Sequence, residues 1–162
     1  MGRWTILSII TVTGLVADQA TKLLVDSKMI LYQSIPLIDG LFSLTYLRNK
    51  GAAFSFLSNA SWRLPFFIAV SLIAALVIIV AMKKLRDDQK LAQISLSMIF
   101  CGAIGNLIDR VRLGEVIDFL DVYVGTYHWP AFNVADSFIT VGVALVAIDM
   151  FREERRIKAS AV

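Results

Sequence analysis

The chain has 162 residues, of which 57% are hydrophobic, and its mean hydropathy is +0.71. This length suits a single domain, but the apolar fraction exceeds the roughly 45–50% of soluble domains, which indicates a lipid environment. The net charge is +3, and the basic residues flank apolar runs, which argues for membrane topology and against nucleic-acid binding. A single cysteine, Cys101, and a single histidine, His128, exclude an internal disulfide and a four-ligand zinc site.

Four apolar runs predict membrane-spanning helices, because each has about the 20 residues that cross a bilayer core. The first contains Asp18 and Lys22, so it spans only if these side chains lie near an interface or face other protein. We therefore expect an integral membrane protein, mainly α, with one membrane-embedded domain over residues 1–162. The expected helices cover about residues 4–25, 64–82, 91–109 and 134–151.

The basic residues also predict an orientation. Nine of the sixteen Lys and Arg residues precede the first run, separate the second from the third, or follow the fourth, together with five acids. The other seven share the opposite side with eight acids. Because cytoplasmic segments carry the excess of Lys and Arg, we expect both termini in the cytoplasm of a bacterial inner membrane protein. The connections at about 26–63 and 110–133 then face outward.

The outward connections contain a strand signal. Residues 41–47 alternate apolar and polar side chains and are bounded by Gly40 and Gly51, which predicts a small extracytoplasmic β-sheet. The second connection is expected to be a periplasm-facing loop. Its Tyr127 and Trp129 suit the headgroup level of a membrane, and His128 between them is expected to be an interfacial loop side chain.

Two charged side chains in the first apolar run are spaced to interact. Asp18 and Lys22 are four residues apart, which predicts an ion pair within the helix. After the expected strand, Asn49 and Gly51 are typical of a tight turn with exposed backbone amides.

The third run carries small and polar residues on one helical face. The small residues permit close helix approach, and the polar ones form a ladder at the outer end. This ladder is either a clasp between helices or an orienting shell for a site, and both readings stay open. The residues are Gly102, Gly105, Asn106, Asp109 and Arg110.

The fourth run begins with the most informative carboxylate. Asn133 is expected to cap this helix, which puts Asp136 in the first turn, where the helix dipole favours the ionised form. An ionisable group at the edge of the hydrocarbon layer is a candidate functional residue. Asp118 precedes it and could share a proton with it, as acid–base catalysis requires. Spacing alone leaves Asp121 and Glu115 open as alternative partners.

Taken in order, these motifs resemble one family, the lipoprotein signal peptidases (signal peptidase II) of bacteria. The resemblance covers nearly the whole chain, and a small departure is Cys101, where the family often has glycine. The matching stretches are residues 18–22 (DQATK), 49–54 (NKGAAF), 102–110 (GAIGNLIDR), 116–119 (VIDF) and 132–137 (FNVADS).

The resemblance implies a four-helix inner-membrane aspartic peptidase without metal or cofactor. It implies cleavage of prolipoproteins before a cysteine that carries diacylglycerol, contact with membrane lipids, and inhibition by globomycin-type cyclic peptides. The family's catalytic dyad maps onto Asp118 and Asp136. The residues that bind substrate or brace the site map onto Asp18, Lys22, Asn49, Gly51, Asn106, Asp109, Arg110 and Asn133.

Two other classes of protein would also use polar residues within membrane helices. A small transporter or proton-relay protein would use Asp18, Asp109 and Asp136 as relay carboxylates, but the charges gather toward one side instead of forming a path. A membrane assembly factor would use the small-residue face of the third run and would leave Asp118 without a role.

Overall fold

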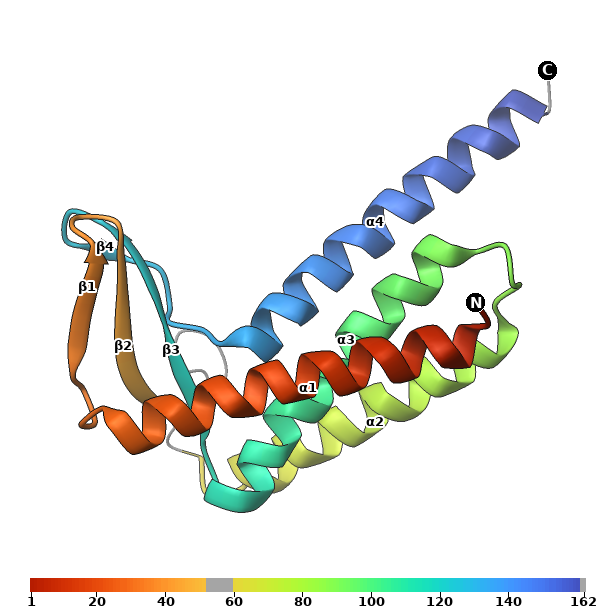
Figure 1. Ribbon diagram of the computed structural model, residues 1–162. Helices are drawn as coiled ribbons and strands as arrows, with labels where there is room; N and C mark the ends of the chain where they lie inside the picture. The colour runs from red at the N-terminus through yellow and green to blue at the C-terminus, as the bar shows by residue number, and fades with distance from the viewer. Residues whose placement is uncertain (52–59, 161–162) are drawn as a thin grey trace.

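The computed structural model describes residues 1–51 and 60–160, and in this part of the chain four long helices carry an antiparallel sheet at one end (Figure 1). All four helices are long and apolar enough to cross a membrane, which confirms the predicted integral membrane, mainly helical fold. The elements are α1 (Arg3–Lys28), β1 (Ser34–Ile38), β2 (Phe42–Asn49), α2 (Arg63–Lys84), α3 (Lys90–Leu113), β3 (Val116–Val124), β4 (Tyr127–His128) and α4 (Val134–Ser160).

The helices run beyond the apolar segments that predicted them. α4 continues to Ser160, because Glu, Arg and Lys are good helix formers and Lys158 pairs with Glu154 at 2.6 Å one turn away. α3 continues to Leu113 and ends where Gly114 adopts a left-handed conformation with φ of 73°. Hydropathy therefore predicts the helices, but it does not predict where α3 and α4 end.

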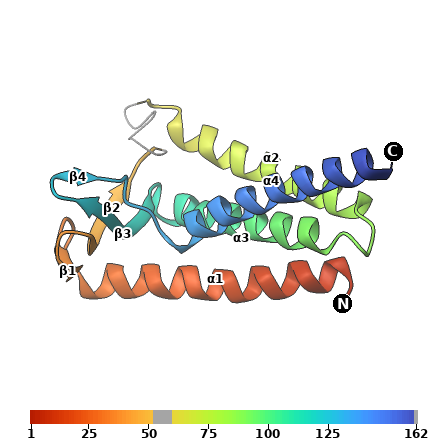
Figure 2. The same ribbon diagram turned by 90° about the horizontal axis from the view of Figure 1, so that it is seen from above.

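α3 is the central helix and packs against α1, α2 and α4 (Figure 2). Two of its glycines lie where other helices approach. A Cβ at Gly102 would overlap the backbone carbonyl oxygen of Ala135 in α4, and one at Gly105 would lie 2.7 Å from a carboxylate oxygen of Asp18 in α1. The small-residue face predicted for the third run therefore brings three helices together at one level.

We expect Gly102→Ala to destabilise the fold by about 1–3 kcal/mol, since overpacking a tight contact forces backbone shifts. The clashing atom belongs to the backbone of α4 and cannot rotate away. The thermal midpoint of the purified protein in detergent measures the effect. Gly2→Ala is the matched control, because its added Cβ meets nothing within 4 Å. Equal midpoints for the two variants would contradict this packing account.

The sheet has the strand order β1-β2-β3-β4 and two chemically different faces. Ile35 pairs with Leu44, Leu44 pairs with Leu120, and Phe42 pairs with Val122, which makes one face apolar. Side chains alternate between faces along a strand, so the neighbouring positions form the other face. That face is mainly polar and contains Ser34, Ser43, Thr45, Asp121, Tyr123 and His128.

Residues 116–124 lie in the connection that was expected to be a loop, and they form strand β3 instead. Their apolar residues suit a strand, but the acidic residues between them obscured the alternation. Strand β2 contains the predicted strand signal. Its register with β3 shifts between Leu44 and Leu47, which places Leu47 opposite Asp118. This bulge turns Asn49, two residues further on, to the same face as Asp118.

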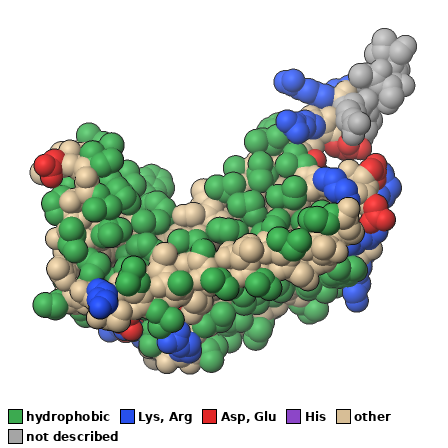
Figure 3. Space-filling view, in the orientation of Figure 1, with side chains coloured by type: hydrophobic (Ala, Val, Ile, Leu, Met, Phe, Trp, Pro, Cys, Tyr) green, Lys and Arg blue, Asp and Glu red, His purple; other side chains and the backbone are tan. Residues whose placement is uncertain are grey.

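The sheet is joined to the C-terminal end of α1. Val25, Tyr46, Ile117 and Phe119 form a buried apolar cluster, and Arg48 in β2 pairs with Asp26 in α1 at 2.7 Å. The N-terminus and the C-terminal part of α4 lie at the other end of the helices (Figure 1). In the space-filling view, hydrophobic side chains cover both the sheet and the helices, with a hollow between the sheet and α4 (Figure 3).

Candidate functional site

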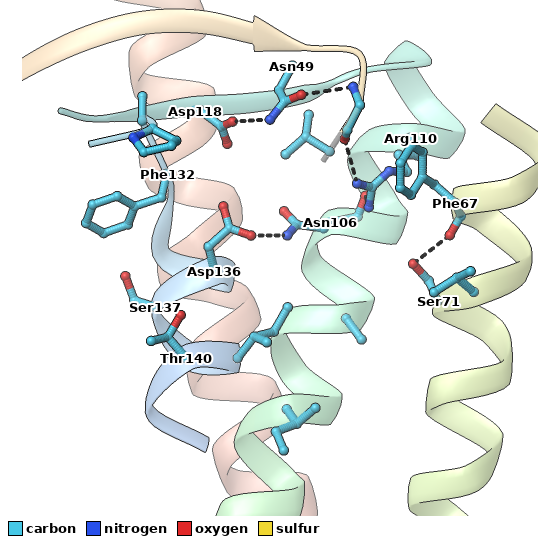
Figure 4. A pocket seen from close by; sticks show the side chains of 18 of the residues that line it. Asn49, Phe67, Ser71, Asn106, Arg110, Asp118, Phe132, Asp136, Ser137 and Thr140 are labelled. Carbon is cyan, nitrogen blue, oxygen red and sulfur yellow. Dashed lines mark hydrogen bonds between the residues drawn. The ribbon is translucent and has the colours of Figure 1, made fainter. Parts of the chain in front are cut away.

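A mostly apolar cavity of about 720 Å³ lies below the sheet, between α2, α3 and α4. Phe67, Ser71 and Thr140 are among the residues on its walls. At its upper end the carboxylates of Asp118 and Asp136 point toward the same space from β3 and from the start of α4 (Figure 4). The cavity therefore has mostly apolar walls and a pair of carboxylates at one end.

Asp136 is held at the N-terminus of α4 by reciprocal capping. The side-chain oxygen of Asn133 accepts the backbone N–H of Asp136 at 2.9 Å, and the backbone N–H of Asn133 donates to Asp136 Oδ2 at 3.3 Å. The predicted cap at Asn133 is confirmed. The amide of Asn106 in α3 donates to Asp136 Oδ1 at 2.7 Å, so both carboxylate oxygens accept N–H groups.

Asp118 is 3% exposed and is also held by amides. Asn133 Nδ2 donates to its Oδ1 at 2.7 Å, and Asn49 Nδ2 donates to its Oδ2 at 2.9 Å. Burial raises the pKa of Asp118 to about 7, and the charge of nearby Asp136 adds to the rise. Asp118 can therefore carry a proton at neutral pH.

A buried ion cluster lies behind the two carboxylates. Lys22 is 1% exposed, and its ammonium lies 3.0 Å from Asp18, 3.0 Å from Asp109 and 3.0 Å from the side-chain oxygen of Asn106. The predicted pair of Asp18 and Lys22 is confirmed, and Asp109 extends it to a second helix. The second oxygen of Asp18 accepts the backbone N–H of Ala135 at 2.9 Å, which ties α1 to α4.

Gln19 also belongs to this cluster, although the sequence did not predict it as a site residue. Its amide donates to Asp18 Oδ2 at 3.0 Å and to Asp109 Oδ1 at 3.1 Å, so it bridges two carboxylates on different helices. The signal was available, since Gln19 stands between Asp18 and Lys22 on a helix expected to be in lipid. A polar residue there must face other protein.

Arg110 and Gly51 complete the rim of the cavity. The guanidinium of Arg110 donates to the backbone oxygen of Gly51 at 3.4 Å and lies 4.9 Å from the centre of the Phe67 ring. The backbone N–H of Gly51 donates to Asn49 Oδ1 at 2.9 Å, as expected for the tight turn. The rest of that motif, residues 52–54, lies outside the described residues.

The two alternative partners for Asp136 lie elsewhere. Asp121 is on the polar face of the sheet. There it accepts a hydrogen bond from the Thr45 hydroxyl at 3.0 Å and lies 2.9 Å from His128 Nδ1. Glu115 lies 3.6 Å from Lys50. Asp118 and Asp121 are three positions apart on one strand, so they face opposite sides of the sheet. Neither alternative lines the cavity, and no three His, Cys, Asp or Glu side chains of residues 1–51 and 60–160 are grouped as metal ligands.

Comparisons with known proteins agree with this arrangement. The family model for signal peptidase (SPase) II matches residues 10–152. The chain is 69% identical over 154 residues to the lipoprotein signal peptidase of Geobacter metallireducens, covering 95% of each chain. It is 50% identical over 143 residues to that of Syntrophus aciditrophicus, covering 87% of this chain and 89% of the relative.

Two solved structures of a bacterial membrane enzyme, obtained by the in meso method at 2.3 Å and 1.9 Å resolution, are also similar. They superpose with TM-scores of 0.83 and 0.82 at 33% sequence identity, covering 91% and 89% of this chain and 88% and 91% of theirs. The family match and the close relatives together show that this chain belongs to the signal peptidase II family of bacterial membrane peptidases.

Proposed function

We propose that the chain is an aspartic endopeptidase that removes signal peptides from prolipoproteins, cutting before a diacylglyceryl-modified cysteine, with Asp118 and Asp136 as the catalytic pair. The observation that carries the proposal is the convergence of these two carboxylates, from β3 and α4, on one cavity. In this account the residues that brace the pair or contact substrate are Asp18, Lys22, Asn49, Gly51, Asn106, Asp109, Arg110 and Asn133.

The reaction requires one proton shared by the two acids. The ionised carboxylate accepts a proton from water while the water oxygen bonds to the scissile carbonyl carbon. The protonated carboxyl donates to the carbonyl oxygen and stabilises the developing charge. When the tetrahedral intermediate collapses, the carbon–nitrogen bond breaks and a proton from the pair passes to the departing amine. Asp118, which is buried, and Asp136, which is partly exposed, suit these roles, since amide groups hold both.

The proposed position of the chain in the membrane brings the site to a membrane-anchored substrate. We place the whole chain, residues 1–162, in the bacterial inner membrane as one domain with both termini in the cytoplasm, as the distribution of Lys and Arg predicts. The sheet and the carboxylates then lie at the outer surface. The apolar face of the sheet and the apolar cavity walls suit lipid chains and the signal peptide, and a globomycin-type cyclic peptide would occupy the same cavity.

The cleavage rate is expected to fall as pH rises above about 7. The raised pKa of Asp118 means that this carboxyl holds its proton up to about pH 7 and loses it at higher pH, which removes the proton donor. The rate should decrease by about tenfold for each pH unit above that point. Measuring kcat from pH 5 to pH 9 tests this, and a rate that stays constant from pH 6 to pH 9 would contradict it.

The proposed activity is tested with the purified protein in detergent. A prolipoprotein carrying diacylglyceryl cysteine is incubated with it, and mass spectrometry identifies the new N-terminus. We expect a cut directly before the lipidated cysteine and much slower cleavage of the same precursor without diacylglycerol. Absence of cleavage under conditions where a related lipoprotein signal peptidase works would contradict the proposal.

A further inference from the structure

We propose that Lys22, acting through the side-chain amide of Asn106, holds Asp136 as the ionised, water-activating member of the pair and leaves Asp118 as the proton donor. This inference rests on the proposed function and adds an assignment of roles to two acids that are otherwise held in similar ways. Lys22 and Asn106 act as positioning residues, since Lys22 acts through Asn106 rather than on the substrate.

The orientation of the Asn106 amide follows from its neighbours. An ammonium has only donors, so the atom of Asn106 that lies 3.0 Å from Lys22 must be the oxygen. Asn133 Nδ2 donates to the same oxygen at 3.2 Å. The NH₂ group of Asn106 therefore faces Asp136 at 2.7 Å. An NH₂ group can only donate, so the facing oxygen of Asp136 must accept, and the ionised carboxylate accepts best.

The amides that hold Asp118 have no cation behind them. Asn49 Nδ2 donates to Asp118, but the oxygen of Asn49 accepts only the neutral backbone N–H of Gly51. The oxygen of Asn133 likewise accepts a backbone N–H, that of Asp136. The two acids thus accept similar numbers of hydrogen bonds. The charge of Lys22 also lowers the pKa of Asp118, against the larger effects of burial and of Asp136. The difference is that Lys22 is linked to Asp136 by one polarised amide, and that Asp136 also lies at the N-terminus of α4.

Other charged groups also lie near Asp136. α1 contributes Asp18 as well as Lys22, and α3 contributes Asp109 as well as Arg110. The two carboxylates partly offset the ammonium, but each also accepts other N–H groups. Asp18 Oδ1 accepts the backbone N–H of Ala135, and Asp109 accepts the backbone N–H of Ile117 at Oδ2 and the amide of Gln19 at Oδ1. β3 contributes Asp118 itself. Among its described residues α2 lines the cavity with Phe67, Val70, Ser71 and Ala74, none of which titrates.

The test compares the pH dependence of cleavage in two variants. The double variant Lys22→Met with Asp109→Asn removes the cation and one anion together, so the net charge of the cluster is unchanged. The lower-pH midpoint of the activity profile reports the ionisation of the water-activating carboxylate. We expect this midpoint to rise by about one pH unit in the double variant. At pH values below the midpoints of both the variant and the unmodified protein, the variant should then be about tenfold slower. Asp109→Asn alone is the control, and its midpoint should not rise. An unshifted midpoint in the double variant would overturn the inference, because a purely structural role lowers the rate equally at every pH.

Asn106→Leu provides an independent test if the double variant does not fold. Leucine has a similar size and leaves Lys22 paired with Asp18 and Asp109. It removes the amide link from Lys22 to Asp136, together with the hydrogen bond that Asn106 accepts from Asn133. The same upward shift of the lower-pH midpoint is expected, and its absence would overturn the inference. Failure of the inference is distinguishable from failure of the proposed function, since the second would show as absence of cleavage by the unmodified protein.

Discussion

Asp118→Asn and Asp136→Asn are each expected to reduce cleavage on the order of 10⁴-fold while the protein remains folded. An asparagine has nearly the same shape as an aspartate but can neither accept a proton from water nor donate one to the amine. Both oxygens of each aspartate accept N–H groups, from Asn49 and Asn133 at Asp118 and from Asn106 and Asn133 at Asp136. The new NH₂ group would leave one of these donors without an acceptor, which costs about 1–3 kcal/mol and lowers the thermal midpoint without unfolding the protein. Cleavage of the lipid-modified precursor and the thermal midpoint, measured on the same preparation, test this.

Asp121→Asn is the matched control for these variants. Asp121 is on the same strand as Asp118 and is also buried, but it faces Thr45 and His128 on the polar side of the sheet. We expect its cleavage rate to stay within a few-fold of that of the unmodified protein. A large loss in Asp121→Asn together with an active Asp118→Asn would move the catalytic role to Asp121.

Lys22→Met as a single change is expected to cost about 3–5 kcal/mol of stability, since it leaves two carboxylates buried without their cation. Asp18 and Asp109 are each 1% exposed, so water does not compensate for the loss. The cluster links α1 to α3 directly and to α4 through Ala135, so the loss should affect the packing of three helices. The thermal midpoint in detergent is the measurement.

Lys158→Met is the control for this loss. Lys158 also pairs with an acid one turn away in its helix, at 2.6 Å from Glu154, but both side chains are mostly exposed. An exposed pair contributes little to stability, so we expect a midpoint close to that of the unmodified protein. If Lys22→Met and Lys158→Met changed the midpoint equally, the buried cluster would not stabilise the fold as described.

Much of the fold could be predicted from patterns of residues that are close together in the sequence. Apolar runs of membrane-spanning length predict the four helices, and the spacing of Asp18 and Lys22 on one helical turn predicts their ion pair. Helix capping was also predictable, because Asn133 precedes an acid by three residues at the start of an apolar run. These features depend on neighbours in the sequence, so the sequence alone contains the information.

The features that could not be predicted depend on pairing between distant segments. Residue spacing left both Asp118 and Asp121 open as partners of Asp136, and only the family resemblance favoured Asp118. The distinction depends on which face of β3 each residue occupies, and that face is defined by the partner strand β2. The bulge between Leu44 and Leu47, which brings Asn49 to Asp118, is likewise a property of the paired strands. The bridge that Gln19 makes to Asp109 joins helices whose relative rotation no local pattern specifies.

The most direct test of the central claim measures binding and cleavage on the same variant. Asp136→Asn is incubated with the lipid-modified precursor, the bound complex is quantified, and the product is followed over time. We expect the precursor to bind about as tightly as it does to the unmodified protein, while product forms on the order of 10⁴-fold more slowly. Product formed at the rate of the unmodified protein would contradict the assignment of the two carboxylates as the catalytic pair.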